Sequence, residues 1–404
     1  MSKTDHVLVV GAGVAGLTAA TCLNMAGIRA TVYEAQPEHV DAGASFAIGE
    51  HGQRVLARIG LLEEVRRHSM PMPERFFTVG GPSGKEIEYT PMDTDIGQSM
   101  EHRCIDRSTF IRILLAEARR RGVEIVYGKR LHQLDQQPES VVATFTDGSR
   151  AEGDLLIGAE GRGSITRSLI FPHARLQHAQ GWSIYGRAET HGLEESLKAE
   201  LERGSSLMYH AGDLMCLAYR DDPLNASQIT WLLMGRSTRK IPAKSFELLD
   251  QDTLLKQLNE GLRPHPPLIA DIVAASTRIA PTQVFHLPPL PAWSQGRVAL
   301  IGDAVHAADP LTGFGTTFAL EDGMYVAKML REHHYIDAFY YLHADRHENA
   351  EKINTHIDPE RDYSKLDYED MQSGYATMAS YHFDLDWDLS DHRPMNTLLD
   401  VPAP

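Results

Sequence analysis

The sequence predicts an α/β protein in which a sheet flanked by helices is interleaved with a β-rich part and followed by a C-terminal helical region. Three observations carry this prediction. A glycine-rich turn near the N-terminus separates an apolar strand from an alanine-rich helix. The stretch from Trp182 to Gly235 is rich in strands, and a second apolar strand, Val298 to Ile301, then runs into another glycine-rich turn. The pattern of an apolar strand followed by a glycine-rich turn therefore recurs after the β-rich stretch.

Composition places the chain among large globular proteins. Its 404 residues are 42% hydrophobic and 23% charged, enough for about two to three domain-sized units. A formal net charge of -16 argues against a nucleic-acid partner, and no dense Lys/Arg cluster predicts attraction to a membrane. The cysteines at positions 22, 104 and 216 have the spacing of neither a disulfide framework nor a metal site. The first strand begins at Val7, which leaves no room for a signal segment, so we expect a cytoplasmic protein.

The first forty residues predict a β-α-β unit that binds a dinucleotide. A strand from Val7 to Val10 leads into Gly11-Ala-Gly13-Val-Ala-Gly16, a helix follows over Val14 to Met25, and a second strand ends at Glu34. The first glycine permits a tight turn, the second lets the backbone approach a pyrophosphate, and the third lets the helix pack on the strand. Glu34 stands where an acid hydrogen-bonds a ribose hydroxyl. Because an acid there disfavours a 2′-phosphate, the site suits FAD or NAD rather than NADP.

The remaining elements follow from periodicity, turn residues and helix caps. Asp106-Arg107-Ser108 is expected to open a helix whose basic last turn complements the helix dipole. Tyr209 to Asp213 is expected to form a turn. The other expected helices are Gln53 to Ile59, Thr109 to Arg121, Leu254 to Ala274 with a proline-rich interruption, and Thr317 to Leu330; the other expected strands are Arg75 to Val79, Val123 to Tyr127, Val141 to Phe145, Asp154 to Gly158 and Ile229 to Met234.

The segment from Gly296 to Thr317 narrows the function most. Its apolar strand runs into Asp303, a proline at position 310 and glycines at 313 and 315. A helix that begins near Gly315 presents unsatisfied N–H groups and a partial positive charge. The two glycines allow the backbone to come close to a planar ring. A plain strand-to-helix turn would explain the segment if the N-terminal dinucleotide pattern were absent.

Together with a third motif, Leu156-Ile-Gly158-Ala-Glu160-Gly-Arg-Gly-Ser164, these segments resemble the class A FAD-dependent monooxygenases, typified by para-hydroxybenzoate hydroxylase and salicylate hydroxylase. The likeness covers roughly residues 5 to 350. It implies a Rossmann-type FAD-binding domain interleaved with a β-rich substrate domain and a C-terminal helical region. The implied segments are 1–70, 101–180 and 285–350 for FAD, 71–100 and 181–284 for the substrate, and 351–404 for an acidic tail or helical cap.

The resemblance implies an enzyme that uses FAD, NAD(P)H and O2 to hydroxylate an aromatic or polyketide-like small molecule through a flavin C4a-hydroperoxide. It implies that Glu34 binds the adenosine ribose, that Arg107 contacts the flavin chain and that Asp303 accepts a hydrogen bond from the ribityl hydroxyls. The turn from Pro310 to Thr317 would lie against the pyrimidine edge of the flavin, where a helix N-terminus stabilises negative charge. The residues predicted to bind the cofactor are Gly11, Gly13, Val14, Ala15, Gly16, Glu34, Ala35, Arg107, Leu131, Glu160, Gly302, Asp303, Pro310, Gly313, Gly315, Thr316 and Thr317.

Two departures from the family pattern leave alternatives open. The middle motif usually reads Gly-Ala-Asp-Gly, where this chain has Glu160, and the turn after Gly313 usually carries Gln and Asn, where this chain has Phe314 and Thr317. One alternative is an FAD-fold enzyme without oxygen chemistry, such as a cyclase or a reductase. Another is a non-catalytic dinucleotide-binding protein. Oligomeric state and the substrate itself are left open by the sequence.

Three residues are candidates for a catalytic base: His210, Tyr219 and His51. No metal site is expected. Arg187, Arg220 and Arg236 are placed either to meet a substrate carboxylate or to face water. Large soft side chains of the β-rich part predict an apolar pocket, but alternation turns only one face of each strand toward the flavin. Most of these side chains are expected to be ordinary core; they are Trp182, Tyr185, Met208, Tyr209, Met215, Tyr219, Trp231 and Met234.

Overall fold

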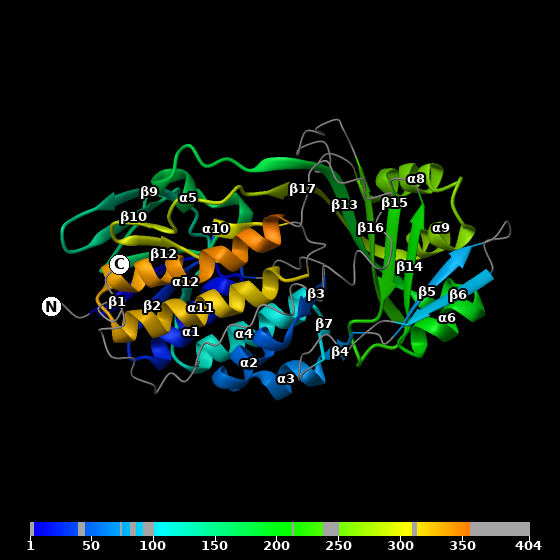
Figure 1. Cartoon of the computed structure of the whole chain (residues 1–404), viewed down its shortest axis with the longest axis horizontal. Coiled ribbons are helices and arrows are strands. Elements are labelled where there is room, and N and C mark those ends of the chain that lie inside the picture. The colour runs from blue at the N-terminus through cyan, green and yellow to red at the C-terminus, as the bar shows by residue number, and fades with distance from the viewer. Residues whose placement is uncertain are drawn as a thin grey trace, which may run out of the picture.

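A computed structural model describes residues 4–38, 45–72, 75–80, 86–91, 101–211, 214–236, 250–308 and 313–355. The described residues form two layered parts that lie end to end along the long axis of the molecule (Figure 1). One part holds a mainly parallel sheet with its helices, and the other holds a larger sheet with three short helices on its far side. The long strands β13 (Gln177–Glu189) and β17 (Ser276–His286) extend between the two parts.

The parallel sheet forms because its strands are apolar on both faces. Val7, Leu8 and Val9 are completely buried, which is typical of strands covered by helices on both sides. All neighbours pair in parallel except the edge strand β18, which is antiparallel. In spatial order the described strands are β18 (Ser294–Gln295), β19 (Val298–Leu300), β12 (Leu155–Gly158), β1 (His6–Val10), β2 (Arg29–Tyr33) and β8 (Glu124–Val126). The predicted return of the chain to the first sheet near Val298 is confirmed.

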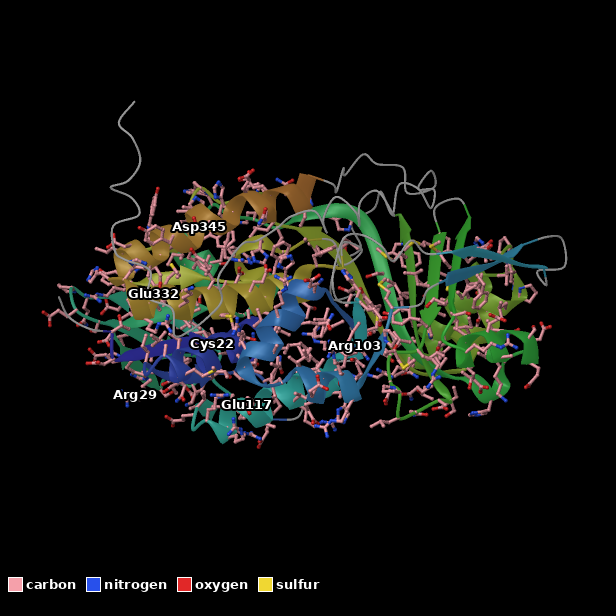
Figure 2. The ribbon with its side chains drawn as sticks, turned by 60° about the horizontal axis from the view of Figure 1, so that its bottom comes forward. Cys22, Arg29, Arg103, Glu117, Glu332 and Asp345 are labelled. Atoms are coloured by element: carbon pink, nitrogen blue, oxygen red, sulfur yellow. The ribbon has the colours of Figure 1, made fainter. Side chains whose placement is uncertain are left out.

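Helices cover this sheet and pack on one another. α1 (Val14–Met25) occupies the predicted residues, and α11 (Gly315–Glu332) packs on it. A β-carbon at Gly323 would lie 2.7 Å from the backbone nitrogen of Ala19, so only glycine permits this approach of the two helices. α12 (Tyr335–Thr355) lies beside α11, as Figure 2 shows with Asp345 on α12 and Glu332 at the end of α11.

Smaller sheets and short helices complete the part that holds the parallel sheet. A three-stranded sheet of β3 (Ser45–Ile48), β7 (Arg103–Asp106) and β4 (Ser69–Pro71) leads into α4 (Arg107–Arg120), which Asp106 caps by accepting the N–H of Thr109 at 2.7 Å. A second, of β11 (Arg150–Gly153), β10 (Val141–Phe145) and β9 (Leu131–Gln136), was predicted only in part. The short helices here are α2 (Glu50–Ile59), α3 (Leu62–Arg67), η1 (Gly161–Gly163), α5 (Ile165–Ile170) and α10 (Asp303–His306).

The larger sheet collects strands from two distant stretches of the chain. Its described strands, in spatial order, are β17, β13, β16 (Gln228–Arg236), β15 (Leu214–Tyr219), β14 (Ser206–Ala211), β5 (Arg75–Gly80) and β6 (Glu86–Pro91). β5 and β6 come from residues 75–91, which explains how the two parts are interleaved. The helices beside the sheet are α6 (Glu195–Glu202), α8 (Gln251–Gly261) and α9 (Pro267–Ala274), and the short η2 (Thr190–Gly192) follows β13.

The two faces of the larger sheet have different surroundings. This difference shows which side chains of each strand point toward the helices. Trp182, Trp231 and Tyr209 belong to the cluster packed under the helices. β-Carbons at Gly186 and Gly235 would lie 2.1 Å from the ring of Trp231 and 2.3 Å from that of Trp182, so the rings lie flat across neighbouring strands. These three aromatic residues are therefore core behind the sheet, as is expected for most of the set.

The predicted turn from Tyr209 to Asp213 was too long. Tyr209 and His210 lie within β14, where β-propensity and pairing with β15 outweigh the turn signal, and Gly212 and Asp213 lie outside the described residues. Cys22, Cys104 and Cys216 are buried free thiols. Across the described ranges, no group of His, Cys, Asp and Glu is arranged to hold a metal ion. In the same ranges, no helix is both long enough and apolar enough to cross a membrane.

Candidate functional site

The three N-terminal glycines have separate structural roles. Gly11 has φ 105°, and a β-carbon at Gly16 would lie 2.0 Å from the carbonyl oxygen of Gly11, so both positions require glycine for the turn itself. A β-carbon at Gly13 would meet nothing within 4 Å. Gly13 also caps α1, whose first turn, beginning with Val14 and Ala15, has no acidic residue and no capping side chain. The open space therefore lies at a helix N-terminus, which suits a diphosphate.

Glu34 is held beside this turn by two backbone groups. Its Oε2 accepts the N–H of Ala12 and its Oε1 that of Gln36, each at 2.8 Å. Each carboxylate oxygen keeps a lone pair for a ribose hydroxyl. The segment that leads to Leu131 runs alongside, because the backbone N–H of Lys129 donates to the carbonyl of Glu34 at 2.7 Å. Leu131 itself is buried at the start of β9, and Ala35 is half-buried.

Arg107 and Asp303 come from distant elements and face each other. Arg107 is the first residue of α4, with its guanidinium 5.3 Å from the ring centroid of Phe46, and Asp303 is the first residue of α10. Both side chains are solvent-exposed. Nevertheless, burial lowers the pKa of Arg107 and raises that of Asp303, and each charge acts against the shift in the other. Both charges are therefore accessible to solvent and surrounded by protein atoms at the same time.

The second glycine-rich turn touches the first. Gly302 adopts φ 60° and ψ −148°, a conformation almost restricted to glycine, and a β-carbon there would lie 2.9 Å from the β-carbon of Ala15. α11 then begins at Gly315, followed by Thr316, and Thr317 Oγ1 accepts the N–H of Gly49 at 3.0 Å. Gly313 has φ 68°, whereas Pro310 lies outside the described residues. The predicted helix N-terminus therefore lies beside the β3–α2 junction.

Two of the departures from the family pattern have structural roles here. Glu160 Oε1 accepts the N–H and the hydroxyl of Thr166 at 2.8 and 2.7 Å, and its Oε2 accepts the hydroxyl of Ser164 at 2.9 Å. It thus orders the start of α5 from within its own loop. Phe314 is 6% exposed and meets the ring of His102 edge-on, with the centroids 5.9 Å apart. Both residues therefore make contacts within the protein itself, Glu160 in its own loop and Phe314 with His102.

The face of the larger sheet opposite α6, α8 and α9 is turned toward this site. Tyr185 acts on the pKa of Arg107, and Arg162 of η1 donates to the hydroxyl of Thr282 on β17 at 2.8 Å. This face is apolar and rich in methionine. Strand alternation and register place on it Tyr185, Met208, Met215, Leu217, Tyr219, Leu232, Met234 and Val284.

Arg187 is committed to an ionic link between the two parts. Its Nη2 donates to Asp106 Oδ2 at 2.6 Å and to Asp221 Oδ2 at 3.1 Å, and its Nη1 donates to Gln228 at 2.9 Å. Burial raises the pKa of Asp221, and Arg187 opposes that rise. Arg187 therefore faces neither water nor a substrate carboxylate. Arg220 donates to the carbonyl of Glu202 at 3.1 Å, and the side chain of Arg236 lies outside the described part.

The three candidate bases are not brought together. Tyr219 lies on the apolar face, where burial raises its pKa well above the usual value and Cys104 and Asp221 raise it further. His51 lies on α2, with Nδ1 3.7 Å from Glu321 of α11. His210 stands opposite Met215 in the β14–β15 register, and its side chain is outside the described part.

His102 is a residue near the site that sequence reasoning missed. It is 9% exposed, and burial lowers its pKa to about 4, with His51 lowering it further and Glu50 opposing. At neutral pH the imidazole is therefore uncharged. It packs against Phe314 and approaches Gly49, but no motif or spacing in the sequence marks it.

Comparison with known proteins agrees with this geometry. A family model described as "FAD binding domain" matches residues 4–353. The chain is 26% identical to 6-hydroxynicotinate 3-monooxygenase of Pseudomonas fluorescens, over 87% of this chain and 90% of that protein. It is 27% identical to the FAD-dependent urate hydroxylase of Klebsiella pneumoniae, over 80% and 81%.

Solved structures share the fold. Klebsiella pneumoniae HpxO, complexed with FAD and uric acid, has a TM-score of 0.77 at 22% identity, covering 93% of this chain and 96% of that one. The 2,6-dihydroxypyridine-3-hydroxylase of Arthrobacter nicotinovorans has a TM-score of 0.76 at 19% identity, covering 88% and 92%. Because the family model spans most of the chain, the protein belongs to the FAD binding domain family, and its resemblance to the class A FAD-dependent monooxygenases is confirmed.

Proposed function

We propose that this protein is an FAD-dependent monooxygenase that uses NAD(P)H and O2 to hydroxylate an electron-rich aromatic small molecule. One observation carries the proposal: Arg107 and Asp303 face each other beside a soft apolar sheet surface. The chemistry that FAD supplies when bound is hydride acceptance from NAD(P)H and activation of O2. One oxygen atom enters the substrate and the other leaves as water. An apolar wall suits this chemistry because it keeps bulk water from the reacting ring.

The residues present fit FAD along the whole of the site. We assign the diphosphate to the open space at Gly13, the adenosine ribose to Glu34, and the chain that leads to the flavin to Arg107 and Asp303. The N-terminus of α11 would face the pyrimidine edge of the flavin. With this assignment, segments 1–70, 101–180 and 285–350 are the FAD-binding domain. Segments 71–100 and 181–284 are the substrate domain, which the membership of β5 and β6 in the larger sheet supports.

The substrate class follows from the chemistry of the apolar face. On β13 the arginine of this face, Arg187, is already paired with two carboxylates. Tyr219 is protonated at neutral pH, and its buried hydroxyl already has Ser45 as one partner. Two named relatives act on hydroxynicotinate and urate. We therefore propose an oxygenated nitrogen heteroaromatic ring as the substrate, held by packing and hydroxyl contacts.

A single set of assays tests the proposed function. The purified protein is checked for bound FAD, and oxidation of NADH and of NADPH under air is followed with 6-hydroxynicotinate, urate, 2,6-dihydroxypyridine and the carbocyclic salicylate. We expect substrate-stimulated oxidation and a product that incorporates oxygen from ¹⁸O2, with the heterocycles preferred. Product formed without a nicotinamide would point instead to a cyclase, and a colourless inert protein would exclude both enzymes.

Replacing Tyr219 with phenylalanine should have a modest effect on turnover. Because burial keeps this phenol protonated, it orients a ring but does not remove a proton, so kcat should fall less than ~10-fold, whereas loss of a base costs ~100-fold or more. The measurement is the pH profile of kcat with the best substrate. Tyr209→Phe, on the opposite face of the sheet, is the matched control and should leave kcat unchanged. A 100-fold loss with a vanished basic limb would make Tyr219 the base.

A further inference from the structure

A cluster of buried charges lies directly behind the second glycine-rich turn. It consists of His306 from α10, Glu321 and Asp322 from α11, and Arg346 from α12, and we refer to it as the Asp322 cluster. Glu321 is 2% exposed, Asp322 0% and Arg346 1%. Buried charges are tolerated only when they are paired. A buried position does not by itself require two adjacent acids, so Glu321 and Asp322 need a further explanation.

Asp322 holds both ends of α10. Its Oδ2 accepts the backbone N–H of Gly302 at 2.7 Å and contacts His306 Nε2 at 2.6 Å. Because an ionised carboxylate only accepts hydrogen bonds, Nε2 carries a hydrogen. Asp303, which we assign to the flavin chain, is the first of the three residues between these two anchors. One carboxylate oxygen therefore fixes the turn that presents Asp303 toward Arg107.

Arg346 keeps Asp322 ionised, and the ionised carboxylate accepts the hydrogen bonds of both Gly302 and His306. Its Nε donates to Asp322 Oδ1, its Nη2 donates to Glu321 Oε2 at 2.9 Å, and its guanidinium lies 5.7 Å from the ring centroid of Phe318. Burial by itself would raise the pKa of Asp322, but Arg346, His306 and the N–H of Gly302 hold it at about 2. The planar guanidinium thus offsets the charge of Asp322 and is at the same time hydrogen-bonded to Glu321.

We infer that Arg346, on the last described helix, is a positioning residue for FAD that acts through Asp322 on the Gly302–His306 turn. This role extends beyond the proposed reaction, because it concerns cofactor binding whatever the substrate. It does rest on the proposed assignment of Asp303 to FAD. Removing Arg346 leaves a buried carboxylate without its main counter-charge, and that carboxylate no longer holds the turn in one geometry.

The test measures FAD affinity without any substrate. Apoprotein of wild type, Arg346→Met and Arg346→Lys is titrated with FAD, and binding is followed by flavin fluorescence and by the visible spectrum. We expect Arg346→Met to bind FAD roughly 10- to 100-fold more weakly, the range seen when the support behind a metal-binding ligand is removed. Arg346→Lys should be intermediate, because an ammonium keeps the charge but not the two-acid geometry.

Arg297→Met is the matched control. Arg297 lies 4.8 Å over the ring of Tyr335 at the start of α12 and donates to the carbonyls of Pro138 and Asp154, but it is not part of the Asp322 cluster. Its loss should lower the melting temperature of the apoprotein and leave the FAD dissociation constant within ~2-fold of wild type. Arg346→Met should move both quantities. A double cycle with Asp322→Asn should show non-additive effects on FAD affinity, since the two residues act as one unit.

Each remaining outcome is decisive. Wild-type FAD affinity in Arg346→Met, even with a lower melting temperature, would reduce Arg346 to a purely structural residue and overturn the inference. If Arg346→Met does not fold, Arg346→Lys decides, and wild-type affinity there would overturn it equally. Asp303→Asn separates the two proposals: if Asp303→Asn binds FAD normally, the assignment of Asp303 has failed, whereas a defect in Asp303→Asn with none at Arg346 is a failure of this inference alone.

Discussion

Alanine at position 16 should remove both stability and FAD binding. Its β-carbon would lie 2.0 Å from the carbonyl oxygen of Gly11, and no side chain can rotate away to relieve that clash because the oxygen belongs to the backbone of the same turn. Either β1 and α1 separate or the turn opens. We expect a loss of about 3 kcal/mol or more in the free energy of unfolding of the apoprotein, larger than ordinary overpacking produces. Urea denaturation of the apoprotein and FAD titration measure the two losses.

Gly13→Ala is the informative contrast to Gly16→Ala. At Gly13 a β-carbon meets nothing within 4 Å, and φ is −80°, which alanine adopts readily. The apoprotein should therefore unfold within ~1 kcal/mol of wild type, the size of a helix N-cap change. FAD affinity should nevertheless fall ~10-fold or more, since the new methyl group occupies the space assigned to the diphosphate.

Gly261→Ala supplies the control for both variants. Gly261 ends α8, its β-carbon would also meet nothing within 4 Å, and it belongs to the helices beside the larger sheet. Stability and FAD affinity should both stay close to wild type. Normal FAD affinity in Gly13→Ala would show that the diphosphate does not approach here. Normal stability in Gly16→Ala would show that the turn can relax without cost.

Local patterns in the sequence were sufficient for the elements that carry the cofactor motifs. An apolar run before three spaced glycines predicted β1 and α1, and an acid before a glycine-rich turn predicted the order of β19 and α11. In these places propensity, turn chemistry and burial all favour the same structure. The site assignments built on those motifs rest on the resemblance and await the titrations proposed above.

What the sequence did not predict depends on contacts between distant residues. Alternation left two faces open for each strand of the larger sheet, and the pairing of Trp182 and Trp231 with glycines of neighbouring strands decided between them. Arg187 meets its acids across the two parts of the molecule, and Arg346 meets Asp322 from the next helix. No local spacing encodes such pairs, because each partner taken alone looks like an ordinary surface charge.

Replacing Arg187 with methionine should destabilise the protein strongly by breaking the ionic link between its two parts. Asp221 is completely buried and would keep the hydroxyl of Thr230, at 2.9 Å from its Oδ2, and that of Ser45 as donors. Removing one partner of a buried pair costs about 3–5 kcal/mol, because the other charge is left without compensation. Urea denaturation at neutral pH should show this loss, and Arg220→Met, which removes an arginine bonded to a carbonyl of the same part, should change stability by less than ~1 kcal/mol.

The pH dependence of that loss identifies its cause. Burial already raises the pKa of Asp221 above its value in the unfolded chain, and without Arg187 the pKa rises further. A raised carboxyl pKa is a penalty that is present at neutral pH and disappears as the pH falls through the folded-state value, because the group then takes up a proton. The difference between Arg187→Met and wild type should therefore be smaller at acidic pH than at neutral pH. Asp221→Asn in the Arg187→Met background should recover much of the loss at neutral pH. A deficit that is equal at both pH values, and unchanged by Asp221→Asn, would mean that Arg187 stabilises the protein by packing and not by charge.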